Sequence, residues 1–200
     1  MYGGGPESRL LRIGGAQPRT ITLEGADYLA GEYPGGRRVN EPLDVNTARG
    51  IGAGELGRLE EILGYTFQDR DLLQRALTRR ARAQEEDSPD SGRHMDALAT
   101  LGDAVIDTAV LESLYTAGVF DKGEISVAKM NLVNMSSLRG LAESAGLVDY
   151  VLWGKGEAHQ HVWTSGRVLA ECMEALCGAV YLDGGMDAVK KVLKKLSFLV

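Results

Sequence analysis

The sequence contains few aromatic residues and no long apolar run. Tyr, Trp and Phe account for 6% of the 200 residues, whereas Ala-, Leu- and Val-rich segments with a helical repeat dominate the second half. Because a membrane-spanning helix needs about 20 consecutive apolar residues, the sequence predicts none. A hydrophobic fraction of 44% is enough for one core. Because of the helical repeat in these segments, we expect an all-α protein. We also expect it to be cytoplasmic, because the N-terminus lacks a signal-peptide pattern.

Cysteine is equally scarce. Cys172 and Cys177 are five residues apart in one predicted helix, so they point to different faces and cannot bond to each other. They also lack the spacing of a zinc site. We expect both to be packed core thiols.

Positive charge is in deficit, with 22 Lys and Arg against 28 Asp and Glu, and the net charge is −6. Nucleic-acid affinity normally comes from Lys and Arg at phosphates, but the distribution of charge matters more than its sum. Two basic clusters are candidate RNA-binding surfaces, with a solvated helix face as the alternative for each. They are Arg75, Arg79, Arg80 and Arg82, and Lys190, Lys191, Lys194 and Lys195.

Glycine and proline are concentrated at the N-terminal end. Residues 1–54 contain 12 of the 26 glycines and four of the five prolines, without a sustained helical repeat. This composition predicts a loop-rich extension, to which the sequence assigns no function. Residues 55–200 are predicted to form one helical domain.

Start and stop residues divide that domain into helices. Asp69 is a predicted N-cap, Gly118 and Gly146 are predicted stops, and Gly184-Gly185 is predicted to break the chain. The expected helices are at about 69–83, 94–117, 122–135, 137–145, 167–182 and 186–198, with polar loops at 84–92 and 153–166.

Three acidic residues lie within apolar helical segments. Asp103 follows Leu101-Gly102, and Glu171 and Glu174 are three residues apart, so these two share a helix face. A buried ionised carboxylate needs a cation or a hydrogen-bond donor. Oxygen ligands from two facing helices suit Mg²⁺, and such a site can serve phosphodiester hydrolysis.

Several further motifs accompany these acids in a fixed order. They are Leu63-Gly64-Tyr65-Thr66-Phe67, Leu77-Thr78, Leu101-Gly102-Asp103-Ala104-Val105, Leu132-Val133-Asn134, Gly154-Lys155-Gly156-Glu157 and the block 169–185. With them the chain resembles the catalytic domain of ribonuclease III from about residue 59 to 199. The resemblance implies an all-α endonuclease bundle that uses Mg²⁺, or Mn²⁺ in its place. It also implies a homodimer that hydrolyses double-stranded or structured RNA. Because no double-stranded-RNA-binding domain follows, the chain is similar to mini-ribonuclease III.

The resemblance also implies a metal site of four acids, two from each helix. Asp103, Glu171 and Glu174 occupy three of these positions, and Asp103 and Glu174 are the expected catalytic residues. Ala99 stands where the family has a Glu. Asp96, seven residues before Asp103, is one candidate replacement ligand. Asp107, one turn after Asp103, and a water molecule are the alternatives.

Two further departures bear on the partner and on the substrate. Thr100 replaces a Phe that inserts into the partner subunit in the family, so a homodimer must rest on other contacts. Arg79-Arg80-Ala81 stands where the family usually has His, Arg and Ser, and both arginines remain candidate RNA-binding residues.

Other polar residues have candidate roles from the same resemblance. Glu124 is expected near the RNA or the metal, with a charge at a helix N-terminus as the alternative. Lys155 is expected to approach a phosphate, with a solvated lysine as the alternative. The Asn134 amide is expected to hold the acidic helices together. Trp153 and Trp163 are expected to pack beneath their loop.

Two functions therefore compete. One is a metal-dependent endoribonuclease that acts in RNA processing. The other is a catalytically weakened or inactive ribonuclease III-like module for RNA binding or assembly, which Ala99 and Thr100 favour.

Overall fold

The structure, a computed structural model, describes residues 51–85 and 92–199. Most of the predicted N-terminal extension and of the acidic segment 84–92 lies outside these residues. The described residues contain no strand, and their one bridge of β type pairs Thr78 with Leu152 in parallel. The prediction of an all-α fold is confirmed. No helix in the described ranges has both the length and the apolar character that crossing a membrane requires.

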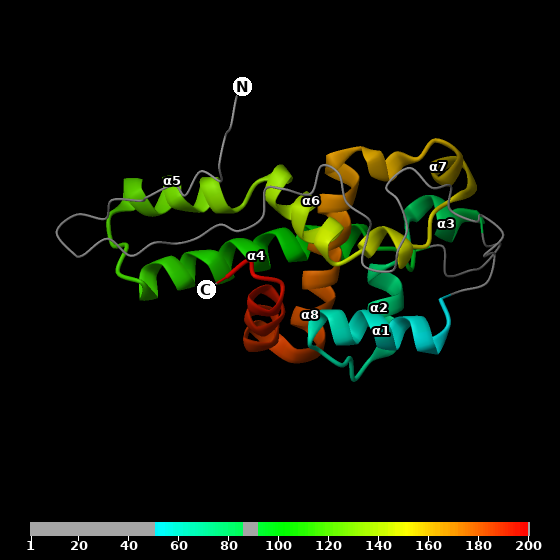
Figure 1. The fold of residues 1–200 in the computed structure, drawn as a ribbon, viewed down its shortest axis with the longest axis horizontal. Coiled ribbons are helices and arrows are strands. Elements are labelled where there is room, and N and C mark those ends of the chain that lie inside the picture. Colours follow the sequence, from blue (N-terminus) through cyan, green and yellow to red (C-terminus); the bar gives the residue numbers. More distant parts are fainter. Residues whose placement is uncertain (1–50, 86–91, 200) are drawn as a thin grey trace, which may run out of the picture.

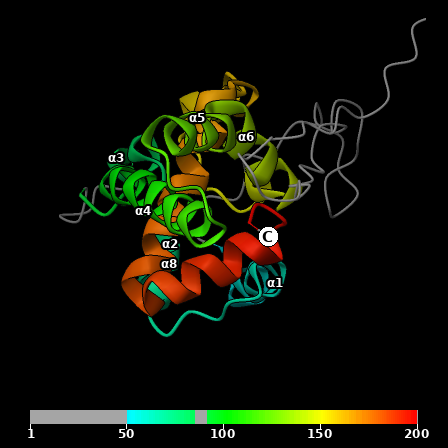
Figure 2. The ribbon, with the colours of Figure 1, turned by 90° about the vertical axis from the view of Figure 1, so that its left-hand side faces the viewer.

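Figure 1 shows how the helices of the described residues are arranged. They are α1 (Ala53–Leu63), α2 (Arg70–Ala76), α3 (Arg80–Glu85), α4 (Asp96–Thr116), α5 (Lys122–Leu132), α6 (Met135–Ser144), α7 (Lys155–His159) and α8 (Gly166–Lys195), with 3₁₀ turns at Leu147–Asp149 and Val162–Thr164. Helices α4 and α5 form an arm on the left of Figure 1, and Figure 2 shows them side by side. Helix α8 packs against α4, α6 and α2.

The contact between α4 and α8 depends on two glycines. A Cβ atom on Gly102 would overlap the carbonyl oxygen of Glu174, and one on Gly178 would overlap the carbonyl oxygen of Leu98. Because glycine lacks a side chain, the two backbones touch at this point. The crossing therefore places Asp103, the next residue of α4, beside the turn of α8 that carries Glu174.

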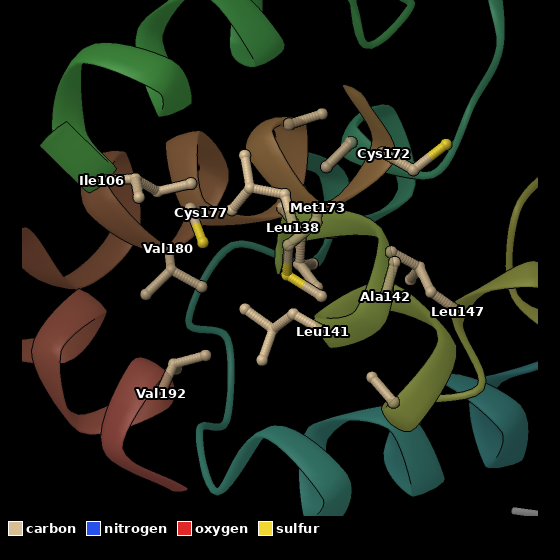
Figure 3. Close-up of a cluster of buried hydrophobic side chains, with 14 of the residues drawn as sticks. Ile106, Leu138, Leu141, Ala142, Leu147, Cys172, Met173, Cys177, Val180 and Val192 are labelled. Atoms are coloured by element: carbon tan, nitrogen blue, oxygen red, sulfur yellow. The ribbon is translucent and has the colours of Figure 1, made fainter. Parts of the chain in front are cut away.

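The core surrounds the first half of α8. Figure 3 shows Met173, Cys177 and Val180 of α8 directed toward Ile106 of α4 and Leu141 of α6. Cys172 and Cys177 are both buried and unbridged, which confirms the prediction of core thiols. Burial raises the pKa of each thiol to about 12.

The predicted helix 69–83 is wrong in its middle, where α2 ends and α3 begins. The Leu152 amide donates to the Leu77 carbonyl over 2.7 Å, and the Arg79 amide donates to the Leu152 carbonyl over 3.1 Å. These backbone groups bond to a distant segment instead of continuing a helix. The predicted N-cap is confirmed, because the Asp69 carboxylate accepts from the Asp71 amide.

The predicted loop 153–166 also contains more structure than expected. Glu157 accepts from the Gly154 amide over 3.2 Å and so caps the short helix α7. Trp163 is buried, and its ring lies 5.3 Å from that of Trp153 between centroids. Packing of the two indoles beneath this segment is confirmed.

The predicted break at Gly184-Gly185 is a kink within α8, where Gly185 has φ 74°. Just before it, the Asp183 carboxylate accepts from the Tyr65 hydroxyl at 2.6 Å and from the amides of Gln68 and Asp69 at 2.9 and 2.8 Å. Burial favours a higher pKa for Asp183, but these donors outweigh it and lower the pKa. The contact fastens the segment between α1 and α2 to the kink.

Candidate metal and RNA site at the crossing of α4 and α8

An open cleft with a volume of about 830 Å³ lies over the α4–α8 crossing. Helices α3, α4, α6, α7 and α8 all contribute side chains to it. Its walls carry both signs of charge. The acidic residues are Asp96, Asp103, Glu157, Glu171 and Glu174, and the basic residues are Arg79, Arg80 and Arg167.

Asp103 and Glu174 face the cleft from the two crossing helices. Glu174 is half-buried, and its pKa is raised to about 7 by burial and by the charges of Asp103 and Glu171, against an opposing effect of Arg167. Asp103 is exposed, so the expectation that its apolar run buries it is wrong. Its neighbours Gly102 and Val105 are buried, whereas Asp103 lies on the face of α4 that is open to the cleft.

Neither of these carboxylates forms a hydrogen bond or an ion pair within the described residues. We call Asp103 and Glu174 the open carboxylates. Their mutual repulsion, together with the partial burial of Glu174, is the electrostatic setting in which a cation binds favourably.

Glu171 differs from them because arginines occupy both of its oxygens. Arg167 Nε lies 3.0 Å from Oε1, and Arg79 Nη1 lies 3.5 Å from Oε2. Arg79 also contacts Glu157 Oε1 through Nε and Nη2, at 3.0 and 2.9 Å. With a side-chain exposure of 15%, Arg79 lies in the wall of the cleft. Arg79 thus lines the cleft without lying on the open surface, and its role in RNA binding stays a prediction.

Comparison with known proteins assigns this chain to a family. Residues 69–199 match the Ribonuclease-III-like family. The chain belongs to this family. Ribonuclease 3 of Ralstonia pickettii is 37% identical over 142 residues, which are 70% of this chain and 52% of that protein. Ribonuclease 3 of Pseudomonas aeruginosa is 39% identical over 137 residues, 68% of this chain and 56% of that protein. The chain spans about half the length of the curated relatives that it matches.

Solved structures of the family agree with this assignment. The nuclease domain of ribonuclease III from Campylobacter jejuni superposes with a TM-score of 0.62 at 30% identity, over 70% of this chain and 94% of that domain. A second structure of the same domain has a TM-score of 0.61 at 31% identity, over 71% of this chain and 92% of that one. The first of these structures concerns flexibility in a region involved in dimer formation.

At residue 99, where the resemblance implies a Glu, this chain has only the methyl group of an alanine. Ala99 is buried in the cleft wall, between Asp96 and Asp103 on the same face of α4. Asp96 begins α4 and pairs with Arg80 Nε at 3.3 Å, and its backbone amide donates to His94 Nδ1 over 3.4 Å. Asp96 faces the cleft as predicted, but its carboxylate is already paired with Arg80.

Three other predicted residues lie outside the cleft. Asp107 pairs with Lys129 Nζ at 2.7 Å, so its prediction as a replacement ligand is wrong. Glu124 is exposed in the first turn of α5, which agrees with a charge at a helix N-terminus. Lys155 begins α7 with an exposed side chain, and its amide donates to Glu85 over 2.6 Å.

Asn134 lines the cleft, but in a different role from the expected one. Its Oδ1 accepts from the Ser137 amide at 3.0 Å, and its Nδ2 donates to the Asn131 carbonyl at 2.9 Å. The side chain is therefore the N-cap of α6. The expectation that this amide links the two acidic helices is wrong.

The basic clusters are less uniform than the sequence predicts. Arg79 and Arg82 are largely buried, whereas Arg80 is 62% exposed and lines the cleft. Lys190 pairs with Glu112, and the other lysines of the last segment are exposed on the second half of α8, outside the cleft. Of the predicted basic residues, Arg80 is thus the one that the structure places as an exposed cation in the cleft.

Sequence reasoning missed Arg167. Its side chain is 75% exposed, lines the cleft and pairs with Glu171 one turn later. The signal was present, because an oppositely charged pair four residues apart forms readily on a helix.

The side chains that could coordinate a metal ion determine which ion this cleft fits. The described residues contain no group of three or more His, Cys, Asp or Glu side chains arranged to hold a metal ion. The two open carboxylates are nevertheless sufficient for Mg²⁺, which proteins commonly bind through one or two carboxylates while it keeps several waters. The residues therefore fit one largely hydrated divalent ion and do not fit an all-protein cage.

Proposed function

We propose that this chain is a divalent-metal-dependent endoribonuclease that hydrolyses double-stranded or structured RNA. One observation carries the proposal. The open carboxylates, Asp103 and Glu174, face the same cleft from two helices in backbone contact, and no basic side chain of the described residues pairs with either. The family supports a phosphodiester substrate, since the relatives that match are named Ribonuclease 3.

The residues of the chain divide the work. Asp103 and Glu174 would hold Mg²⁺ or Mn²⁺, and the helices that carry them are in backbone contact at Gly102 and Gly178. Arg80 offers an exposed guanidinium to the RNA backbone. When bound, the ion supplies activation of water and neutralisation of phosphate charge.

A homodimer completes the proposal. The arm of α4 and α5, together with the connection between them, exposes the large apolar side chains of Tyr115, Phe120, Val127 and Met130, with exposures of 59, 71, 50 and 62%. Exposed apolar groups of this size mark interaction surfaces. Thr100 is also exposed and hydrogen-bonds to the Asp96 carbonyl at 3.2 Å, so this position contributes no apolar anchor.

The direct experiment is cleavage of a perfect RNA duplex by the full chain with Mg²⁺ or Mn²⁺. An EDTA control and the Glu174→Gln variant accompany it. We expect cleavage that needs the ion and is lost in the variant. Activity that survives in both controls would contradict the proposal.

The competing function is a catalytically inactive RNA-binding module. Ala99 favours it, because the cleft offers two open carboxylates where the family has four acids. This function predicts binding of the duplex without cleavage at any metal concentration. Ala99→Glu separates the two cases, since an increase in cleavage would show that the missing carboxylate alone limits activity.

A further inference from the structure

Glu171 is bound in a way that conflicts with the role of a metal ligand. Each of its two oxygens faces a guanidinium, Arg167 at 3.0 Å and Arg79 at 3.5 Å. A divalent ion at Glu171 would have to displace at least one of these partners. At the open carboxylates it displaces no side chain.

Arg79 is not easily displaced. Two of its nitrogens bind Glu157, and its side chain is 15% exposed. Removing one member of a buried ion pair leaves an uncompensated charge, which is strongly unfavourable. Arg79 therefore fixes one oxygen of Glu171 from within the wall of the cleft.

Arg167 is held on the opposite, solvent side of Glu171. Its side chain is 75% exposed, and its contact to Glu171 uses Nε. A guanidinium has five N–H donors in a planar fork, so the two terminal nitrogens of Arg167 remain available to a ligand. Such a fork matches the geometry of a phosphate group.

The formal charges of the arginines and carboxylates around Glu171 are also compatible with binding of an anionic phosphodiester. Arg79 and Arg167 balance Glu157 and Glu171, so these four side chains are neutral together. The open carboxylates add two negative charges, which a divalent ion would cancel. With one ion bound, an anionic phosphodiester meets no excess negative charge at this end of the cleft.

We propose that Glu171 is not a metal ligand but the anchor that holds Arg167 in the cleft as a phosphate-binding residue. A single divalent ion lies beside it, between Asp103 and Glu174. The inference rests on the proposed metal-dependent cleavage of RNA and names the residue that contacts its phosphodiester. Glu171 and Arg79 are positioning residues, since they act through Arg167.

The first test measures Mn²⁺ binding by the full chain, by calorimetry and by the electron paramagnetic resonance of the free ion. Wild type is compared with Glu171→Gln and Glu174→Gln at pH 8, with circular dichroism as the check on folding. We expect one ion per chain. Affinity should change by less than about threefold in Glu171→Gln and fall by about tenfold or more in Glu174→Gln, by the scale of losses at metal sites.

The outcomes separate the two proposals. Equal losses in both variants, or two ions per chain, would overturn the role given to Glu171 and leave the metal-dependent function standing. A folded wild type that binds no Mn²⁺ would overturn both.

The second test measures duplex RNA binding in EDTA, where no cleavage obscures it. Arg167→Gln is compared with Arg58→Gln, which removes an exposed arginine of α1 outside the cleft. We expect Arg167→Gln to weaken binding by about threefold to tenfold and to lower the salt dependence by about one phosphate contact. Arg58→Gln should change affinity by less than about twofold. Equal effects of the two variants would overturn the assignment of Arg167, and a wild type without RNA affinity would also overturn the proposed substrate.

Discussion

Two groups of carboxylates share one cleft and differ in a single respect. Asp96, Glu157 and Glu171 each pair with an arginine, whereas the open carboxylates, Asp103 and Glu174, do not. Residue type and helix position do not separate the groups, because Glu171 and Glu174 are one turn apart on α8. The difference arises from which guanidinium the fold brings within reach. Within this cleft, the contacts made by the fold therefore distinguish carboxylates that have an arginine partner from carboxylates that have none.

The largest expected effect concerns an open carboxylate. Asp103→Asn keeps the shape of the side chain and removes the charge that would hold the ion. We expect metal-dependent cleavage of duplex RNA to fall by about a thousandfold or more, with an unchanged circular dichroism spectrum. Since Asp103 is exposed, its loss leaves the core intact. Cleavage within about tenfold of wild type would remove Asp103 from the site.

The next effect concerns the helix crossing that brings the open carboxylates together. Gly102→Ala places a methyl group against the backbone of α8, which cannot yield as a flexible side chain does. We expect a loss of about 3 kcal/mol in the free energy of unfolding, measured in urea. The control is Gly57→Ala in α1, where the added Cβ meets nothing within 4 Å. That variant should gain up to about 1 kcal/mol from helix propensity. Similar values for both would mean that the backbones do not touch.

Substitutions of two neighbouring arginines compare the stability contributed by a buried ion pair with that contributed by an exposed one. Arg79→Met leaves Glu157 without its buried cation and should cost about 3 kcal/mol in unfolding free energy. Arg80→Met removes an ion pair whose arginine is 62% exposed, and should cost less than about 1 kcal/mol. Urea unfolding of the two variants side by side measures the difference. A larger loss for Arg80→Met would reverse the assignment of which arginine is structural.

The smallest effect is a dependence on pH. The pKa of Glu174 is raised to about 7 in the folded protein, so ionisation of this carboxyl opposes folding. The native state without metal therefore loses stability as pH rises from about 4 through about 7. Glu174→Gln does not titrate. In EDTA, its stability relative to wild type should thus increase by about 1 kcal/mol between pH 5 and pH 8, after allowance for solvent screening. A difference that is constant with pH would show that neither burial nor the charges of Asp103 and Glu171 raise the pKa of Glu174.

Much of the fold follows from local sequence signals. The N-cap Asp69 and the positive-φ glycines Gly118, Gly146 and Gly185 act within a few residues, and the structure confirms each of them. The break between α2 and α3 has no such local cause. It depends on hydrogen bonds to Leu152, which lies more than 70 residues later in the chain.

The site divides in the same way. The resemblance to ribonuclease III implies that Asp103 and Glu174 share one site, and the structure places both side chains in the same cleft. The pairing of Glu171 with Arg167 is a local contact, four residues apart on one helix. The second contact of Glu171, to Arg79, has no local signal. Arg79 and Glu157 are 78 residues apart, and their pairing depends on how α7 packs against α3. A sequence pattern identifies which residues are acidic, but pairing between distant elements decides which of them stay open.

The most direct test of this account is a crystal structure of the full chain soaked in Mn²⁺, with the ion located by its anomalous scattering. We predict one peak at coordination distance from both Asp103 and Glu174, with Glu171 still bound to Arg167 and Arg79. A peak coordinated by Glu171, or no peak between the open carboxylates, would contradict it.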